Sequence, residues 1–406
     1  MKEQKTRDTF RAGPFEYHQE IELTVDTLTN LGVGLGRVDG WVVMVPFSLP
    51  GERVRARIFR NHKNYSEADL IEVTEPSPHR VQPKCDLFGN CGGCQYQHLS
   101  YEQQLKWKQQ QVKEIFAHLA GIETAVNPPL SSEQTFHYRS KITPHFNKPT
   151  NEVDIGFLKQ GQRHALVDVE QCVIATERIN SVLPCERQAL KSNPQKFKRG
   201  GTLLLRDTMD GIMTNPKAPC REKIGEWVFH FTAGEFFQNN PFVLPKMIDY
   251  VVKQASAGGA EYLVDAYCGV GVFAIAAHSL FKEVVGIEVN SEGIKWAHKN
   301  ALSNHATNCS FIEGNAENIF TNIAVPGNKT AIIIDPPRKG CDEAFIQQLL
   351  AFAPARIVYV SCAPDTQARD LKTILQSHPY KLVEVQPIDL FPQTRHIENV
   401  CVLERV

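Results

Sequence analysis

The sequence lacks the features that would direct it into a membrane or out of the cell. No apolar run approaches the ~18 residues needed to cross a bilayer, and the first residues, MKEQKTRDTF, have no apolar core of a signal peptide. An excess of charge is also missing, because 44 Lys and Arg balance 45 Asp and Glu. Any nucleic-acid role must therefore come from local patches. We expect a cytoplasmic protein with no membrane partner.

The cysteines lack the pattern of a disulfide framework. There are eleven of them, an odd number, spread over 406 residues, and disulfides are rare in a reducing cytosol. Cys85, Cys91 and Cys94 nevertheless lie within the short, glycine-punctuated loop CDLFGNCGGC. The loop could be a catalytic centre or a metal site, and with a fourth thiolate it could hold zinc or an iron–sulfur cluster.

The chain is too long for one core, and its first part is typical of a small β-barrel. Residues 20–73 contain short strand-like runs separated by turns, as in a barrel of the OB kind. Within RVRARI, Arg53, Arg55 and Arg57 alternate with apolar residues, so all three share one face of a strand. That face is either a surface that tracks phosphates or an ordinary solvated outer face.

A helix is predicted after the cysteine loop, with its N-cap at Ser100 and its end at Gly121. Its predicted apolar face consists of Leu105, Val112, Ile115, Phe116 and Leu119. Residues 130–235 contain strand-like pieces such as DIGFLK, GTLLLRD and WVFHFT. They suggest a second, mostly antiparallel unit.

From about residue 240, apolar strand-like runs alternate with helical ones. The expected strands are YLVDAY, EVVGIEV, AIIID, RIVYVS and KLVEVQPI, with VCVLERV as one more at the end. Helices are expected to start near residues 271, 291 and 364. Such alternation predicts a doubly wound α/β sheet.

The loop VDAYCGVGVFA carries glycines between a predicted strand and a predicted helix. Gly269 and Gly271 would let a ligand approach the backbone. Glu288 ends the next strand and can accept hydrogen bonds from ribose hydroxyls. These features fit NAD and S-adenosylmethionine alike, and a tight structural turn is a third interpretation. Asp265, just before the loop, favours the methyl donor.

Two further strand ends carry residues suited to chemistry, because ligands of doubly wound sheets bind outside the carboxyl ends of the strands. Asp335 ends one strand, just before a proline pair. Cys362 ends another at a predicted helix N-terminus, where the helix dipole would stabilise a thiolate; the alternative is an inert core cysteine. Glu398, before the last strand, is a candidate proton acceptor or simply a solvated glutamate.

Seven motifs in this order, EFFQNN, DAYCGVGVF, GIEVN, GNAEN, DPPRKG, SCAPDTQARD and HIEN, resemble those of the RNA uracil-5-methyltransferases of the TrmA/RumA type. The N-terminal barrel resembles the TRAM domain of the RumA-like branch. The resemblance implies an α/β protein of three parts. These are an OB-like TRAM β-barrel that binds RNA (15–76), a central α+β domain with an iron–sulfur loop (77–235), and a doubly wound, Rossmann-like methyltransferase domain (236–406). We expect a monomer.

The same resemblance implies the roles of individual residues. Cys362 would be the nucleophile and Glu398 the base. The residues around the S-adenosylmethionine would be Gln238, Tyr267, Gly269, Gly271, Glu288, Asn315 and Asp335. Together with Cys172, the three loop cysteines Cys85, Cys91 and Cys94 would bind a [4Fe–4S] cluster, which the resemblance places ahead of zinc.

The expected substrate is a uridine of 23S ribosomal RNA, with the T-loop uridine of transfer RNA as the alternative. A base must leave its stack to reach such a site, and Phe236 or Phe237 could stack on it or lie in the core. Two other classes of protein compete with this interpretation. An NAD-linked iron–sulfur oxidoreductase would leave SCAPDT and HIEN unexplained. A catalytically inert RNA-binding protein would not need the retained Cys362 and Glu398.

Overall fold

The computed structural model describes residues 10–148, 153–162, 164–196, 199–314, 320, 323–377 and 380–406. The chain divides into two compact units. The smaller unit contains Met1–Trp107, Phe157–Val167 and Gln393–Arg395, and the larger unit contains Lys108–Gly156, Asp168–Pro392 and His396–Val406. In the described ranges, no helix is long and apolar enough to cross a membrane.

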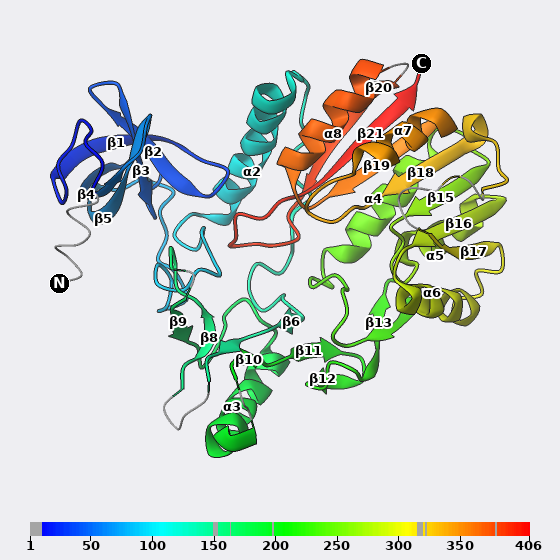
Figure 1. Ribbon diagram of the computed structural model, residues 1–406, viewed down its shortest axis with the longest axis horizontal. Coiled ribbons are helices and arrows are strands. Elements are labelled where there is room, and N and C mark those ends of the chain that lie inside the picture. Colours follow the sequence, from blue (N-terminus) through cyan, green and yellow to red (C-terminus); the bar gives the residue numbers. More distant parts are fainter. Residues whose placement is uncertain are drawn as a thin grey trace. The chain divides into compact units, whose positions relative to one another are not determined.

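The smaller unit is built around a closed five-stranded barrel with the strand order β1-β2-β3-β5-β4 (Figure 1). The strands are β1 (Glu20–Leu28), β2 (Val33–Val38), β3 (Trp41–Pro46), β4 (Arg53–Asn61) and β5 (Tyr65–Glu75). Val54, Ala56 and Ile58 of β4 point into the barrel core. The predicted barrel is therefore confirmed, and the period-two pattern of β4 explains its inward face.

The outward face of β4 carries the three arginines of RVRARI, as predicted. Each of them forms an ion pair with a glutamate of a neighbouring strand. The pairs are Arg53 with Glu22 and Glu75, Arg55 with Glu20 and Glu72, and Arg57 with Glu20. Because these acids balance the arginines, the arrangement favours a solvated outer face over a phosphate-tracking one. Exposed pairs of this kind contribute little to stability, about 0–1 kcal/mol each.

The helix after the cysteine loop is α2 (Tyr101–Ile115), continued by a π-helical turn, η1 (Phe116–Ala120). Gly121 ends it in the left-handed conformation, with φ of 68°, as predicted. Val112 and Phe116 are buried, but Leu119 is 53% exposed, so its place on the apolar face was predicted wrongly. The π turn takes more residues per turn than an α turn, which shifts Leu119 out of register and buries Ala120 instead.

Short, mostly antiparallel strands follow, as expected. One sheet has the order β10-β7-β8-β9 and contains β7 (His145–Phe146), β8 (Ile155–Leu158), β9 (Leu166–Asp168) and β10 (Gly201–Thr202). Another has the order β12-β11-β6 and contains β6 (Lys141–Ile142), β11 (Leu205–Thr208) and β12 (Gly211–Met213). A hairpin pairs β13 (Pro219–Ile224) with β14 (Trp227–Thr232). Helix α3 (Glu177–Ser192) begins at the N-cap Thr176 and precedes the short η2 (Pro194–Lys196).

The larger unit is organised by a seven-stranded sheet with the order β17-β16-β15-β18-β19-β21-β20. Its strands are β15 (Tyr262–Ala266), β16 (Glu283–Glu288), β17 (Cys309–Glu313), β18 (Thr330–Ile334), β19 (Arg356–Ser361), β20 (Tyr380–Ile388) and β21 (Glu398–Arg405). The first five are mutually parallel, and β21 is antiparallel to both β19 and β20. This is the predicted doubly wound, Rossmann-like sheet.

Helices lie on both faces of this sheet (Figure 1), and an apolar core fills the space on each face. One is formed with α4 (Leu244–Ser256), α5 (Val272–Ala277) and α6 (Ser291–Ser303), and the other with α7 (Glu343–Phe352), α8 (Pro364–Ser377) and the end of α2. The short turns η3 (His278–Leu280) and η4 (Gly327–Lys329) complete the connections. The helix starts predicted near residues 271, 291 and 364 are confirmed. The three helices begin after Gly271, after the N-cap Asn290 and at Pro364.

Candidate active site

Three of the predicted site residues meet at the carboxyl edge of the larger unit's sheet. Asp335 follows β18, Cys362 lies between β19 and α8, and Glu398 is the first residue of β21. The strands β18, β19 and β21 are neighbours in the sheet. Ser361 of β19 lies opposite Asn399 of β21, which brings the next residues, Cys362 and Glu398, to the same edge.

The thiol of Cys362 lies in an acidic, half-buried environment. Its pKa is raised to about 11, first by burial and then by the charges of Glu398 and Asp335, while Arg338 opposes the rise through its charge and a hydrogen bond. This environment opposes the expected stabilisation of a Cys362 thiolate by the N-terminus of α8. Burial and two carboxyls outweigh the helix dipole.

The pKa of each carboxyl of the cluster is raised above its ordinary value. Burial raises the pKa of Asp335 to about 7. Glu398 is only 2% exposed, and burial together with the charge of Asp335 raises its pKa well above the usual range, with Arg338 acting in the opposite direction. Carboxyls with raised pKa values that adjoin a thiol are suited to exchanging protons during a reaction.

Arg338 is a candidate functional side chain that the sequence analysis missed, since it acts on the pKa of both Cys362 and Glu398. It lies in the loop DPPRKG (335–340), a motif whose aspartate alone was singled out. The loop is held against α8 by Arg369, which donates hydrogen bonds to the carbonyls of Lys339 and Cys341 at 2.9 and 3.3 Å. Asp370 accepts the backbone N–H of Cys341 at 2.8 Å. A cation three residues after a strand-end aspartate, beyond the proline pair, was the signal available in the sequence.

The glycine loop lies at the end of β15, next to Glu288. One oxygen of the Glu288 carboxylate accepts the N–H of Gly269 at 3.0 Å, and the other accepts the N–H of Asn290 at 2.8 Å. Gly269 has φ of 54°, and a side chain there would meet nothing within 4 Å. Gly271 begins α5 with φ of 88°. The open space beside Gly269 leaves room for a ligand to touch the backbone, and each carboxylate oxygen keeps a further lone pair for it.

Other predicted ligand-site residues are placed around this loop or near it. Asp265 is fully buried, accepts the N–H of Ala274 at 2.9 Å, and has its pKa raised to about 8 by burial and by the nearby Asp335 and Glu288. Tyr267 is half-buried with φ of 66°. Gln238 is half-buried in the segment between β14 and α4. Asn315 lies outside the described residues.

The two candidate stacking aromatics differ sharply. Phe237 is 4% exposed and stacks on Phe231, with ring centroids 4.3 Å apart and planes at 3°. Phe236 is 74% exposed. Phe237 is therefore a core residue, and Phe236 is the ring that is available to a base.

The predicted cluster cysteines belong to both units, with Cys85, Cys91 and Cys94 in the smaller unit and Cys172 in the larger. The loop is ordered by hydrogen bonds from the N–H of Cys85 to the Gln97 side chain and from the N–H of Gly92 to the carbonyl of Leu158. Across the described residues, no three or more His, Cys, Asp or Glu form a group that could hold a metal. Four thiols are the donor set that an iron–sulfur cluster takes.

Comparison with known proteins decides the family. A relative from Schizosaccharomyces pombe named tRNA (uracil(54)-C(5))-methyltransferase is 42% identical over 420 residues, which covers 97% of this chain and 80% of that protein. The chain belongs to the RNA uracil-5-methyltransferase family. The Saccharomyces cerevisiae protein of the same name is 33% identical, covering 96% and 74% of the two chains. An uncharacterized RNA methyltransferase from Halalkalibacterium halodurans is 31% identical, covering 96% and 98%.

Family models and a solved structure agree with this assignment. The model described as tRNA (Uracil-5-)-methyltransferase matches residues 221–406, and the TRAM domain model matches residues 15–71. The crystal structure of Pyrococcus abyssi tRNA (uracil-54, C5)-methyltransferase with S-adenosyl-L-homocysteine has a TM-score of 0.73 to this chain, covers 94% of it and is itself covered to 99%. At 24% identity, this likeness shows the shared fold. The predicted resemblance, including the TRAM barrel, is confirmed.

Proposed function

We propose that this protein transfers the methyl group of S-adenosylmethionine to C5 of a uridine in RNA. The observation that carries the proposal is the cluster of Cys362, Glu398, Asp335 and Arg338 at one edge of the sheet. A thiol beside a buried carboxyl supplies both the nucleophile and the base that this reaction needs. An NAD-linked oxidoreductase would have no use for that pair.

The chemistry divides one hard step into easier ones. Cys362 loses its proton to solvent and its sulfur bonds to C6 of the uracil, so that the electron pair of the C5=C6 bond makes C5 enolate-like. C5 then takes the methyl group, and S-adenosylhomocysteine leaves. Glu398, as carboxylate, removes the remaining C5 proton, the C5=C6 bond re-forms and the C6–S bond breaks, which frees Cys362.

The surrounding residues receive supporting roles in the proposal. Arg338 stabilises the thiolate of Cys362 and the carboxylate of Glu398. The Gly269–Gly271 backbone and Glu288 hold the methyl donor, together with Gln238, Tyr267, Asn315 and Asp335. Phe236 provides the stacking surface for a base that has left its helix, for which single-stranded loops are the preferred source.

For the substrate, we place transfer RNA first. The named relatives at 42% and 33% identity both carry the tRNA uracil-54 name, whereas the sequence resemblance had favoured 23S ribosomal RNA. The ribosomal substrate stays a prediction.

One experiment distinguishes the two substrates. The protein is incubated with labelled S-adenosylmethionine and with unmodified tRNA and unmodified rRNA in parallel, and the nucleosides of each RNA are then analysed. The proposal expects 5-methyluridine in the tRNA; label in the rRNA alone would reverse the order, and no 5-methyluridine in either would refute the activity.

We also propose that the chain has three domains, at residues 15–76, 77–235 and 236–406. A further proposal is a [4Fe–4S] cluster on Cys85, Cys91, Cys94 and Cys172. The support for the cluster is the resemblance and the four thiols, and no chemical step is assigned to it. Iron, acid-labile sulfide and zinc are measured on anaerobically purified protein. Cys91→Ser should lose iron and sulfide and fall in folding yield or RNA affinity. Stoichiometric zinc without sulfide would replace the cluster with a zinc site.

A further inference from the structure

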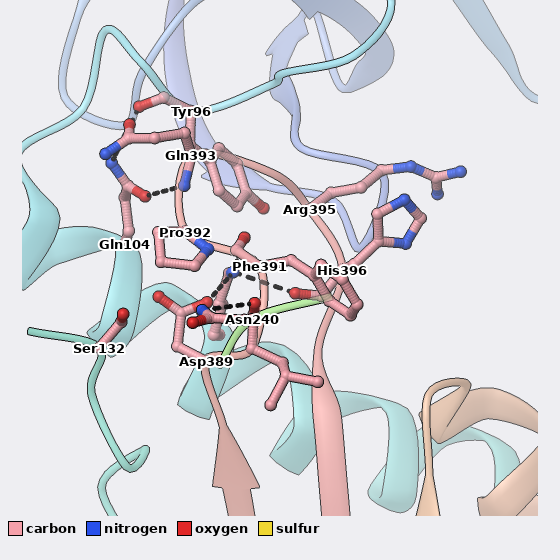
Figure 2. A network of polar contacts seen from close by, with 12 residues as sticks. Tyr96, Gln104, Ser132, Asn240, Asp389, Phe391, Pro392, Gln393, Arg395 and His396 are labelled. Atoms are coloured by element: carbon pink, nitrogen blue, oxygen red, sulfur yellow. Dashed lines mark hydrogen bonds and ion pairs between the residues drawn. The ribbon is translucent and has the colours of Figure 1, made fainter. Parts of the chain in front are cut away.

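The connection between β20 and β21 is anchored by buried side chains along its length. We call residues 389–397 the strap; it ends one residue before Glu398. Asp389 and His396 lie near its two ends (Figure 2). The strap carries no helix or strand of its own, so its shape depends on the groups that bind it.

Lys108 of α2 joins the two ends of the strap. Its ammonium lies 2.6 Å from a carboxylate oxygen of Asp389 and donates to the carbonyls of Phe391 at 3.2 Å and His396 at 3.0 Å. These three acceptors match the three N–H donors of an ammonium group. The Lys108 and Asp389 side chains are 1% and 0% exposed. One buried cation therefore fixes both the first residue of the strap and the residue two positions before Glu398.

Neighbouring side chains of the larger unit hold the strap between these points. The Asn240 amide donates to the carbonyl of Leu390 at 2.9 Å, and the Tyr138 hydroxyl donates to the carbonyl of Pro392 at 2.9 Å. Within the smaller unit, Gln393 is bound in turn. Its N–H and side-chain oxygen pair with the Gln104 amide at 3.1 and 3.0 Å (Figure 2).

Stability alone is a weak reason to bury such an ion pair. Removing two charges from water costs several kcal/mol per ion, and apolar replacements of similar volume are often as stable or more so. A lysine that donates hydrogen bonds to two backbone carbonyls as well as to a carboxylate fixes the course of the backbone. An apolar pair cannot do this. The backbone fixed in this way continues into Glu398, whose carboxylate is proposed to remove a proton from the substrate.

We propose that Lys108 is a positioning residue, which holds the strap so that the Glu398 carboxylate stands at the C5 proton of the bound uridine. The inference rests on the proposed function. It assigns Lys108 to one step, the elimination. Bond formation between Cys362 and C6, and methyl transfer to C5, precede that step and do not use Glu398.

The test separates the steps of the reaction. Full-length Lys108→Met is compared with Lys106→Met, an exposed lysine two residues earlier on α2, using unmodified tRNA and labelled methyl donor. Lys108→Met should lower kcat by on the order of 10²-fold, the loss expected for a misplaced catalytic group, with KM unchanged. The methylated RNA should accumulate as a covalent protein adduct on denaturing gels. Lys106→Met should behave as wild type.

Two outcomes overturn the proposal: an unchanged kcat in Lys108→Met, or a loss of turnover without adduct enrichment. If Lys108→Met fails to fold, the double variant Lys108→Met/Asp389→Leu removes both buried charges, and it should keep the same adduct excess. Wild-type turnover in that double variant would also overturn the proposal. Wild type and Glu398→Gln serve as references. Absence of 5-methyluridine in wild type, or of adduct in Glu398→Gln, would count against the proposed function instead.

Discussion

Arg338 donates a hydrogen bond to the thiol of Cys362, and its charge also lowers the pKa of Glu398. One guanidinium therefore favours the anionic form of both the proposed nucleophile and the proposed base. Because burial and Asp335 act in the opposite direction, the acidity of the cluster is set by a balance that single substitutions can shift.

Replacing Cys362 with alanine should abolish both turnover and the covalent RNA adduct, because the variant lacks the thiol that is proposed to bond to C6. The matched control is Cys185→Ala, since Cys185 is an exposed cysteine of α3. Both variants are assayed by nucleoside analysis and by denaturing gels of the RNA–protein mixture. Residual 5-methyluridine in a pure Cys362→Ala preparation would remove Cys362 from the mechanism.

The rate of adduct formation should rise with pH across the range from about pH 6 to pH 9, since only the thiolate attacks and the pKa of Cys362 is raised to about 11. Arg338→Met removes a cation that lowers this pKa, so its profile should move to still higher pH. Lys339→Met, the next residue of the same exposed loop, is the control. The measurement is the single-turnover adduct rate against pH. An Arg338→Met profile that overlays wild type would show that the guanidinium does not act on the thiol.

The two adjacent phenylalanines should respond differently to truncation. Phe236→Ala should weaken RNA binding with an unchanged melting temperature, because its ring is 74% exposed. Phe237→Ala should lower the free energy of unfolding by about 3–5 kcal/mol, the usual loss for a buried phenylalanine. Equilibrium binding to unmodified tRNA and thermal unfolding distinguish the pair. RNA affinity that is unaffected in Phe236→Ala would argue against stacking.

Asp265→Asn should stabilise the protein increasingly as the pH rises. The carboxyl has a pKa of about 8 when folded and about 3.9 when unfolded. Its contribution to stability is therefore complete below about pH 4 and is lost as the pH rises through about 8. An amide oxygen can still accept the N–H of Ala274. The melting-temperature difference between variant and wild type should widen from about pH 5 to pH 8.

The control for Asp265→Asn is Asp342→Asn. Asp342 is the exposed N-cap of α7, and asparagine can still cap a helix. Its melting-temperature difference from wild type should not widen with pH. A constant difference for Asp265→Asn would mean that this carboxyl does not titrate in that range. The comparison is made without the methyl donor, because a ligand beside Asp265 would change its surroundings.

Features with local causes were predictable from the sequence. Gly271, the N-cap Asn290 and Pro364 each mark a helix start, so α5, α6 and α8 begin where the sequence indicates. The strand-end residues Asp335 and Cys362 follow from the same alternation. The period-two arginines of β4 were placed correctly on one face, but their pairing with glutamates depends on which strands become neighbours.

Other features depend on contacts between distant residues. Lys108 and Asp389 are 281 residues apart in the chain, and a lysine in a polar helical stretch gives no sign that it will be buried. The π turn that exposes Leu119 has no local signal of its own. Asn315, predicted to contact the methyl donor, lies outside the described residues and stays a prediction.

The order of the sheet has a consequence for biosynthesis. β21 follows β20 in the chain but lies between β19 and β20 in the sheet. The sheet therefore lacks one of its inner strands until residues 398–405 have left the ribosome. During translation the barrel can fold early, while Glu398 reaches Cys362 only when this last strand inserts. A nascent chain can therefore hold a folded barrel before Cys362 and Glu398, the proposed catalytic pair, have come together.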